Sequence, residues 1–239
     1  MTTADEAGTE AVTQESAPAL PSFPKRVMQV FFSPGDLTSA LAKNPAWAAA
    51  LLLGAILMVG QMALIPADVW DTVFRETMLR QGREMPEGFG AGGTFMRVSA
   101  VVGGTIAFLV MSFIIAGVTT LIFAFVMGDE GRFKQYLSIL AHAWLIPVVV
   151  GFALVPLKIS QSNPQFTLNL GTFFFFLPEG YPLKVLTMLD LSQVWAWLVL
   201  AQGVHAVDPK RSFGSAAAVL SVLFIGLTML IAIWAPMPG

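Results

Sequence analysis

The chain has 239 residues, of which 56% are hydrophobic and only 12% are charged, and its formal net charge is −2. A soluble domain carries about 25% charged residues, so much of this chain has no aqueous face to cover. The weak net charge excludes the footprint of a nucleic-acid-binding protein, and the lack of cysteine excludes disulfides, thiol catalysis and thiolate metal sites.

Residues 1–24 are rich in Ala, Thr and Pro, and they carry four acids and no base: Asp5, Glu6, Glu10 and Glu15. Such a segment has too few large apolar side chains to offset the entropy of an ordered chain. It also lacks the basic start and apolar run of a signal peptide. We therefore expect a disordered acidic tail here, followed by one membrane domain over residues 25–235.

The stretch from Ser33 to Asp36 predicts the start of a short amphipathic helix. Ser33 would cap the helix, Pro34 would occupy its first turn, and the carboxylate of Asp36 would favour its positive end. A helix of this kind just before a spanning helix typically lies in the membrane interface. Its apolar face and the bases expected to face headgroups are Leu37, Ala40 and Leu41, and Lys25, Arg26 and Lys43.

Long apolar runs dominate the rest of the chain. Residues 98–127 and 136–157 contain no Asp, Glu, Lys or Arg, and the short turn from Gly128 to Gln135 joins them. About 20 apolar residues cross the bilayer as a helix, and backbone amides in lipid require helical pairing. We predict an all-α polytopic bundle of five transmembrane helices, over residues 46–65, 98–127, 136–157, 189–207 and 213–234.

Small residues and one proline give the expected packing of these helices. Pro147 lies in the middle of the third span, where the missing N–H predicts a kink. Small side chains let helices approach closely in lipid. They recur every four positions in the first two spans, as Ala46, Ala50 and Gly54, and as Ser99, Gly103 and Ala107.

The distribution of bases predicts the orientation. Both very short turns lie on the amino-terminal side, and they contain Arg132 and Lys134, and Lys210 and Arg211. Short loops rich in Lys and Arg stay in the cytoplasm. The amino terminus is therefore expected in the cytoplasm and the carboxy terminus on the far side.

Three ionisable residues lie within or beside the predicted spans. His142 and His205, the latter one turn after Gln202, are expected at similar depth. Such a pair would be packed and hydrogen-bonded, or would form a shared metal or proton site. Asp190 opens the fourth span, where it would cap the helix or serve transport. No motif for a hydrolase, redox site or cofactor occurs, so no cofactor is expected.

Three motifs together resemble the Ypt-interacting-protein (YIP) domain family, and its bacterial members in particular. They are Phe32–Asp36 before the first span, Gly128–Ser138 leading to Pro147, and Leu189–Trp195 at the start of the fourth span. The resemblance covers about residues 25–235. It implies a five-span helical bundle with a cytosolic amino terminus, in the cell (inner) membrane for a bacterial source. Eukaryotic relatives are linked to Rab-type GTPases and membrane traffic.

The sequence thus favours a non-enzymatic membrane scaffold or adaptor. Beyond lipid, its partners would be proteins, or a second copy of the chain, that bind the tail, the interfacial helix and the turn with Asp129, Arg132 and Lys134. The alternative is a small-solute transporter or channel subunit that uses the polar fourth span and the kink at Pro147. Transporters commonly contain internal repeats, and the absence of a detectable one makes that alternative less favoured. An intramembrane enzyme is the third and weakest hypothesis.

Overall fold

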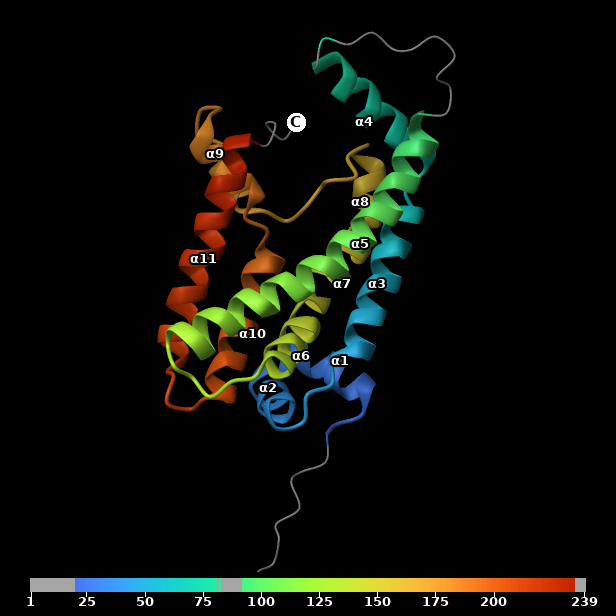
Figure 1. Ribbon diagram of the computed structural model, residues 1–239. Coiled ribbons are helices and arrows are strands. Elements are labelled where there is room, and N and C mark those ends of the chain that lie inside the picture. The colour runs from blue at the N-terminus through green and yellow to red at the C-terminus, as the bar shows by residue number, and fades with distance from the viewer. Residues whose placement is uncertain (1–19, 81, 83–91, 235–239) are drawn as a thin grey trace, which may run out of the picture.

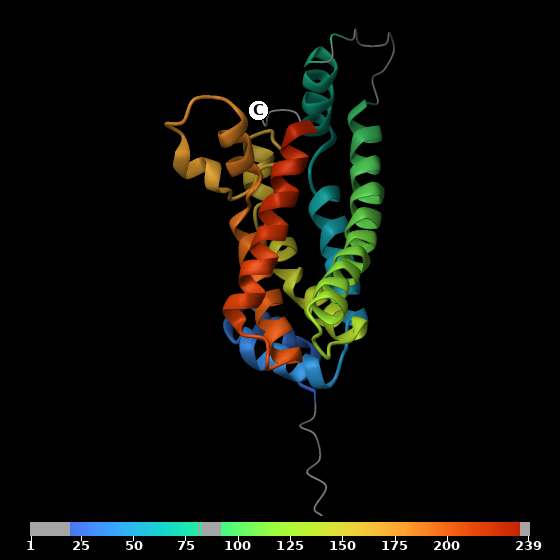
Figure 2. The same cartoon turned by 60° about the vertical axis from the view of Figure 1, so that its left-hand side comes forward.

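The computed structural model describes residues 20–80, 82 and 92–234, and its described elements are helices (Figure 1). Most of the predicted tail, residues 1–19, lies outside this part. The long helices run between two ends of the molecule, with α1 and α2 across one end and α4, α8 and α9 at the other (Figures 1 and 2). The predicted all-α fold class is confirmed.

Two short helices form the layer at the first end. They are α1 (Phe23–Phe32), which the sequence analysis missed, and α2 (Pro34–Lys43), which starts at the predicted residue. Ser33 separates the two helices and occupies the N-cap position of α2, but its side chain makes no capping hydrogen bond there, contrary to the prediction. The buried face of α2 packs on α6 and α10 and consists of Leu37, Thr38, Leu41 and Ala42.

α3 (Ala48–Ala63) packs on α5, and Gly54 of the predicted small-residue stripe lies at this contact. A Cβ on Gly54 would lie 2.6 Å from Cζ of Phe108, so only glycine allows this approach. α4 (Ala67–Arg80) then turns away from α3, and the two axes differ by 79°. A small second core under this bend consists of Ile65, Val69, Trp70 and Val155.

α5 (Gly92–Thr120) continues into a π-helical turn, η1 (Leu121–Val126). The wide turn ends at Gly128, whose φ of 75° is in the left-handed region that favours glycine. The predicted stripe of Ser99, Gly103 and Ala107 is exposed and makes no close helix contact, because a Cβ on Gly103 would meet nothing within 4 Å. The prediction of packing at this stripe is wrong within the described chain.

The third predicted span is broken into α6 (Phe133–Ala143), α7 (Leu145–Ala153) and α8 (Val155–Ser160). The first break is at Trp144, three residues before Pro147, which cannot donate the backbone hydrogen bond to Ala143. This segment forms the centre of the fold, and every residue from Tyr136 to Ile146 except Trp144 is buried.

The chain then crosses the second end through η2 (Leu170–Phe174) and α9 (Tyr181–Met188), and returns as α10 (Leu191–Val207) and α11 (Phe213–Trp234). α10 contacts α2, α6, α7 and α11, so it connects the amino-terminal, central and carboxy-terminal helices. Gly203 permits the approach of α10 to α6, because a Cβ there would overlap Cγ2 of Ile139.

In the described chain, three segments are long and apolar enough to cross a bilayer: Gly93–Val126, Phe133–Ala153 and Phe213–Trp234. The bent pair of α3 and α4 would be a fourth. α10 is apolar but has only 17 residues, fewer than the about 20 that a straight span needs. The structure therefore confirms a multipass membrane protein but not the predicted count of five spans.

Candidate functional site

A buried polar network joins α1 to the central helix. Nη1 of Arg26 donates to the Ala46 carbonyl at 3.2 Å and lies 3.2 Å from Nε2 of His142. Nδ1 of His142 is 2.8 Å from the Ser138 carbonyl, and the Ser138 hydroxyl accepts the Ala46 N–H at 2.8 Å. Arg26 is 7% exposed and does not face headgroups as predicted. This network fixes the entry into α3 against α6.

The two histidines have separate partners. Nδ1 of His205 donates to the Arg211 carbonyl at 2.7 Å, whereas His142 bonds within the α1 network. Gln202 lies beside Gly35, where it contributes to the packing of α2 on α10. Within the described residues no hydrogen bond joins the histidines, and no three carboxylate or imidazole side chains gather as metal ligands would. The predicted shared cluster does not form there.

A second polar group links the two short turns at the same end, and we call it the turn clamp: Asp129, Glu130, Asp208, Lys210 and Arg211. Nη2 of Arg211 pairs with Oδ1 of Asp129 at 2.7 Å and also donates to the Met127 carbonyl. The carboxylate of Asp208 accepts the backbone N–H of Glu130 at 3.1 Å and that of Lys210 at 2.9 Å. Lys210 pairs with Glu130 at 2.9 Å on the surface.

The contacts within the clamp shift the pKa values of two of its residues, Asp208 and Arg211. Backbone hydrogen bonds from Glu130 and Lys210 hold the pKa of Asp208 below its ordinary value, and the positive charges of Lys210 and Arg211 act in the same direction. The hydrogen bond and charge of Asp129 raise the pKa of Arg211. Each shift favours the charged form, which is the form that holds the turns together.

The other predicted residues of this end lie on its surface. The backbone N–H of Arg132 donates to Oε1 of Gln135 at 2.8 Å, which closes the first turn of α6. The side chains of Arg132 and Lys134 are exposed beside the clamp. Pro34 occupies the first position of α2, as expected. These residues provide accessible charge on a surface that the clamp makes rigid.

A half-open cavity of about 620 Å³ lies between the helices toward the opposite end, and we call it the central cavity. α3, α4, α5, α7, α8, α10 and the loop at residues 164–167 line it. Its walls are mainly apolar, and Pro147 lies in one of them. Its polar side chains include Gln61, Trp70, Lys158 and Gln193. The volume is within the about 300–1,000 Å³ typical of small-molecule sites.

Asp190 lies at the edge of the central cavity and takes the N-cap position expected for it. Its Oδ1 accepts the backbone N–H of Ser192 at 2.7 Å and of Gln193 at 3.2 Å, and the Ser192 hydroxyl as well. The capping carboxylate favours the positive end of α10. One oxygen of Asp190 is therefore committed to helix structure.

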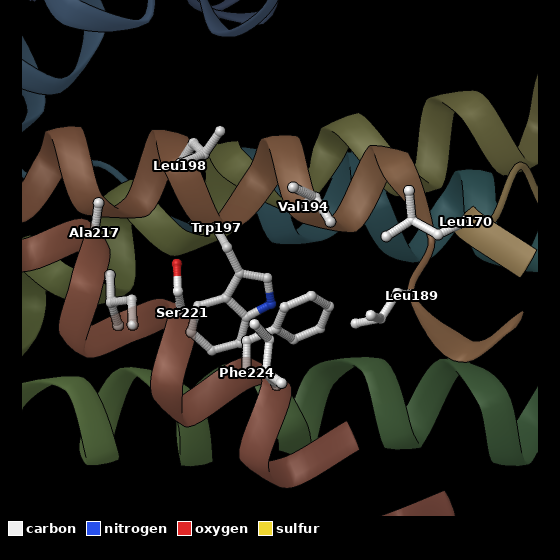
Figure 3. Close-up of a pocket in the computed structure, with 10 residues that line it drawn as sticks. Leu170, Leu189, Val194, Trp197, Leu198, Ala217, Ser221 and Phe224 are labelled. Carbon is white, nitrogen blue, oxygen red and sulfur yellow. The ribbon is translucent and has the colours of Figure 1, made fainter. Parts of the chain in front are cut away.

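A smaller pocket of about 200 Å³ lies between α10 and α11 (Figure 3). The rings of Trp197 and Phe224 stack beside it with centroids 5.3 Å apart. Ser221 is the one hydroxyl among its lining residues. The pocket offers no charged group for recognition, so it reads as a packing gap on the side of α11.

Sequence reasoning missed the burial of two cations that bear on these sites. Arg26 was assigned to headgroups, and Lys158 was counted only for topology, although it directly follows the uncharged run that ends at Leu157. A lone base at the end of a spanning helix is the signal that could have identified Lys158. Gln61, its hydrogen-bond partner, and Trp70, which lines the same cavity, are too far away in sequence for any motif to connect them to it.

Comparison with curated proteins gives no match, and comparison with solved structures gives none either. The sequence profile of the Yip1 domain matches residues 28–235, which is most of the chain and close to the domain expected from the sequence. The chain therefore belongs to the Yip1 domain family of membrane proteins.

Proposed function

We propose that this protein is a non-enzymatic membrane scaffold, with five spans, that binds partner proteins at the end formed by α1, α2 and the turn clamp. The observation that carries the proposal is the clamp itself. It ties two turns that are about 80 residues apart in sequence into one rigid surface. Exposed charged side chains cover that surface: Lys25, Lys43, Glu130, Arg132, Lys134 and Lys210.

The proposal places this end in the cytoplasm. Support comes from the bases gathered there, since short loops rich in Lys and Arg stay on the cytoplasmic side. α1 adds a face on which Lys25, Met28 and Phe32 are exposed together. A basic and apolar face of this kind fits an anionic membrane surface, so α1 would also anchor the end in the interface.

Cysteine labelling tests the orientation directly, because the native chain has no cysteine. Lys134 lies in the first turn of α6, beside the turn clamp, and Glu179 lies just before α9 at the other end of the molecule (Figure 1). Both native side chains are exposed, so Lys134→Cys and Glu179→Cys are accessible to a reagent. A membrane-impermeant maleimide should label Glu179→Cys in intact cells, and Lys134→Cys only after permeabilisation. Labelling of both positions in intact cells would contradict the five-span topology.

Photo-crosslinking tests partner binding. A photoreactive amino acid at Lys43 or Lys134 should give discrete protein adducts in native membranes, and the same group at Glu179 should not. Adducts with a second copy of the chain would identify the partner as a homo-oligomer. Equal adduct patterns at all three positions would contradict a dedicated docking end.

The central cavity favours one alternative, a small-solute transporter. Transporters place substrate sites near discontinuous helices, and the cavity lies beside the break between α6 and α7. Flux of a panel of ions and small solutes into proteoliposomes separates the two functions. Saturable flux that a leucine at Gly104 abolishes would replace the scaffold proposal, whereas no flux supports it.

A further inference from the structure

The central cavity collects hydrogen-bond donors that lack a good acceptor. Lys158, Gln61 and Trp70 are only 5%, 4% and 7% exposed. Nζ of Lys158 is 3.4 Å from Oε1 of Gln61, which is longer than the about 2.7–3.2 Å of a good hydrogen bond. Within the described residues the indole N–H of Trp70 has no partner.

Gln61 does not supply the missing hydrogen-bond acceptors. Its Nε2 donates to the Sδ of Met58 at 2.9 Å, and a thioether is a weak acceptor. Gly151 is what lets Gln61 reach this position, because a Cβ there would lie 2.6 Å from Oε1 of Gln61. The site is therefore built to hold the amide beside Lys158, and still leaves donors without oxygen acceptors.

The positive charge of Lys158 is compensated only at a distance, by the carboxylate of Asp190. No ion pair joins it to a carboxylate in the described part of the chain. Asp190 also lines the cavity, but its Oδ1 caps α10. A buried charge with one long hydrogen bond and no direct ion pair is costly, so an anionic oxygen from a ligand would lower the free energy of this site.

The rest of the cavity suits a hydrocarbon chain. Ala100, Gly104 and Ala107 lie on one face of α5 and form a shallow wall, and a Cβ on Gly104 would meet nothing within 4 Å. Other faces of α5 expose apolar side chains, among them Val102, Ile106 and Val110. α5, which lines the cavity, packs on α3, α4 and α6. The cavity is therefore adjacent to the bilayer.

We propose that the central cavity binds an anionic lipid, with its carboxylate or phosphate at Lys158, Gln61 and Trp70 and one acyl chain along Ala100, Gly104 and Ala107. Both kinds of lipid carry an anionic headgroup with several oxygens, attached to an acyl chain. The site is separate from the docking end and does not depend on the proposed scaffold function.

Photoaffinity labelling of the full-length protein in phosphatidylcholine vesicles tests the proposal. Three probes carry the same diazirine acyl chain: a free fatty acid, a lysophosphatidic acid and a neutral monoacylglycerol. Adducts are located by peptide mass spectrometry. One or both of the anionic probes should label cavity residues such as Ala100, Ala107 and Met111, and the one that labels more strongly identifies carboxylate or phosphate as the preferred headgroup.

Matched variants separate headgroup recognition from general effects. Lys158→Met should weaken labelling by the anionic probe about tenfold or more, the effect of losing a hydrogen bond to a charged group. Lys184→Met is its control, because Lys184 is 9% exposed near the same end but does not line the cavity. Lys158→Arg should keep most of the labelling.

A second pair keeps the test decisive if Lys158→Met fails to fold. Gly104→Leu should fill the cavity and abolish its labelling, whereas Gly103→Leu, at the exposed preceding position of α5, should not. Three results would overturn the proposal: equal labelling by the neutral probe, equal effects of Lys158→Met and Lys184→Met, or adducts confined to residues such as Val102, Ile106 and Val110.

Discussion

The turn clamp and the central cavity both hold charged groups out of water, but they satisfy them differently. In the clamp, Arg211 meets Asp129, and both oxygens of Asp208 accept backbone N–H groups. In the cavity, Lys158 has one long contact to an amide oxygen. A polar group that is fully paired within the chain stabilises the fold, and one that lacks a partner points to a ligand.

Packing follows the same division. At the end that carries the clamp, α10 lies against α6 so closely that a Cβ on Gly203 would overlap Ile139. In the cavity, a Cβ on Gly104 would meet nothing within 4 Å. The helices are therefore tightly packed at the clamp end and leave a cavity toward the other end. A glycine-to-leucine substitution tests both: it should overpack the first place and fill the second.

The largest effect is expected for Gly203→Leu. The added side chain must displace Ile139 or separate α10 from α6, and overpacking of this kind costs about 1–3 kcal/mol. Gly226→Leu is the control, since Gly226 is exposed on α11 with open space around it. Denaturant unfolding in micelles should show a loss for the first variant and none for the second. Equal stability of the two would mean that the closed end is not tightly packed.

Arg211→Met should give the next largest loss of stability. It leaves Asp129, whose side chain is 5% exposed, without its charged partner. Removing one member of such a pair is worse than removing both. The double variant with Asp129→Asn should therefore regain part of the lost thermal midpoint. A double variant less stable than Arg211→Met would show that the pair is not the feature that matters.

Lys158→Met should change stability in the opposite direction from Arg211→Met. The substitution removes a buried cation that has no ion pair in the described chain and replaces it with an apolar side chain of similar length. In lipid-free micelles, its thermal midpoint should equal or exceed that of the wild type. A fall as large as that of Arg211→Met would indicate that Lys158 is a structural group like those of the clamp.

The clamp should weaken in acid through Asp208. Because hydrogen bonds lower its folded-state pKa, the stabilisation is fully present above the unfolded pKa of about 4 and is lost as pH falls through the lower folded value. The difference in thermal midpoint between wild type and Asp208→Asn should be constant near neutral pH and shrink below about pH 4. A difference that persists at the lowest pH would show that the charge of the Asp208 carboxylate is not the cause of the stabilisation.

The sequence predicted the features that depend on local chemistry. Pro34 starts α2, Asp190 caps α10, and the uncharged runs on either side of the Gly128–Gln135 turn are helices. Each follows from a cap, a proline or a periodic pattern within a few residues. α1 was missed because Phe23–Phe32 directly follows the acidic tail, although Ser22 and Pro24 give the same start signal as Ser33 and Pro34.

The functional features could not be predicted because they join distant segments. Gln61 and Lys158 are 97 residues apart, and Asp129 and Arg211 are 82 apart. Periodicity shows which residues face inward but not which helix they meet. The helix is interrupted at Trp144, three residues before Pro147, although Phe133–Ala153 remains one candidate span, and the two histidines, similar in expected depth, point to different partners.

The smallest effect is expected for Lys210→Ala, within the clamp itself. Lys210 and Glu130 are 2.9 Å apart, but their side chains are 80% and 79% exposed, against 19% and 5% for Arg211 and Asp129. Water and salt screen an exposed pair, so its loss should not change the thermal midpoint measurably, and wild type and variant should respond alike to added salt. The two pairs bridge the same two turns, but the Arg211 pair is both more buried and better bonded, since Arg211 donates to both oxygens of Asp129 whereas Lys210 donates once to Glu130. If Lys210→Ala destabilised the protein as much as Arg211→Met, neither burial nor the extra hydrogen bonds would be what makes the clamp strong, and the contrast with the central cavity would lose its physical basis.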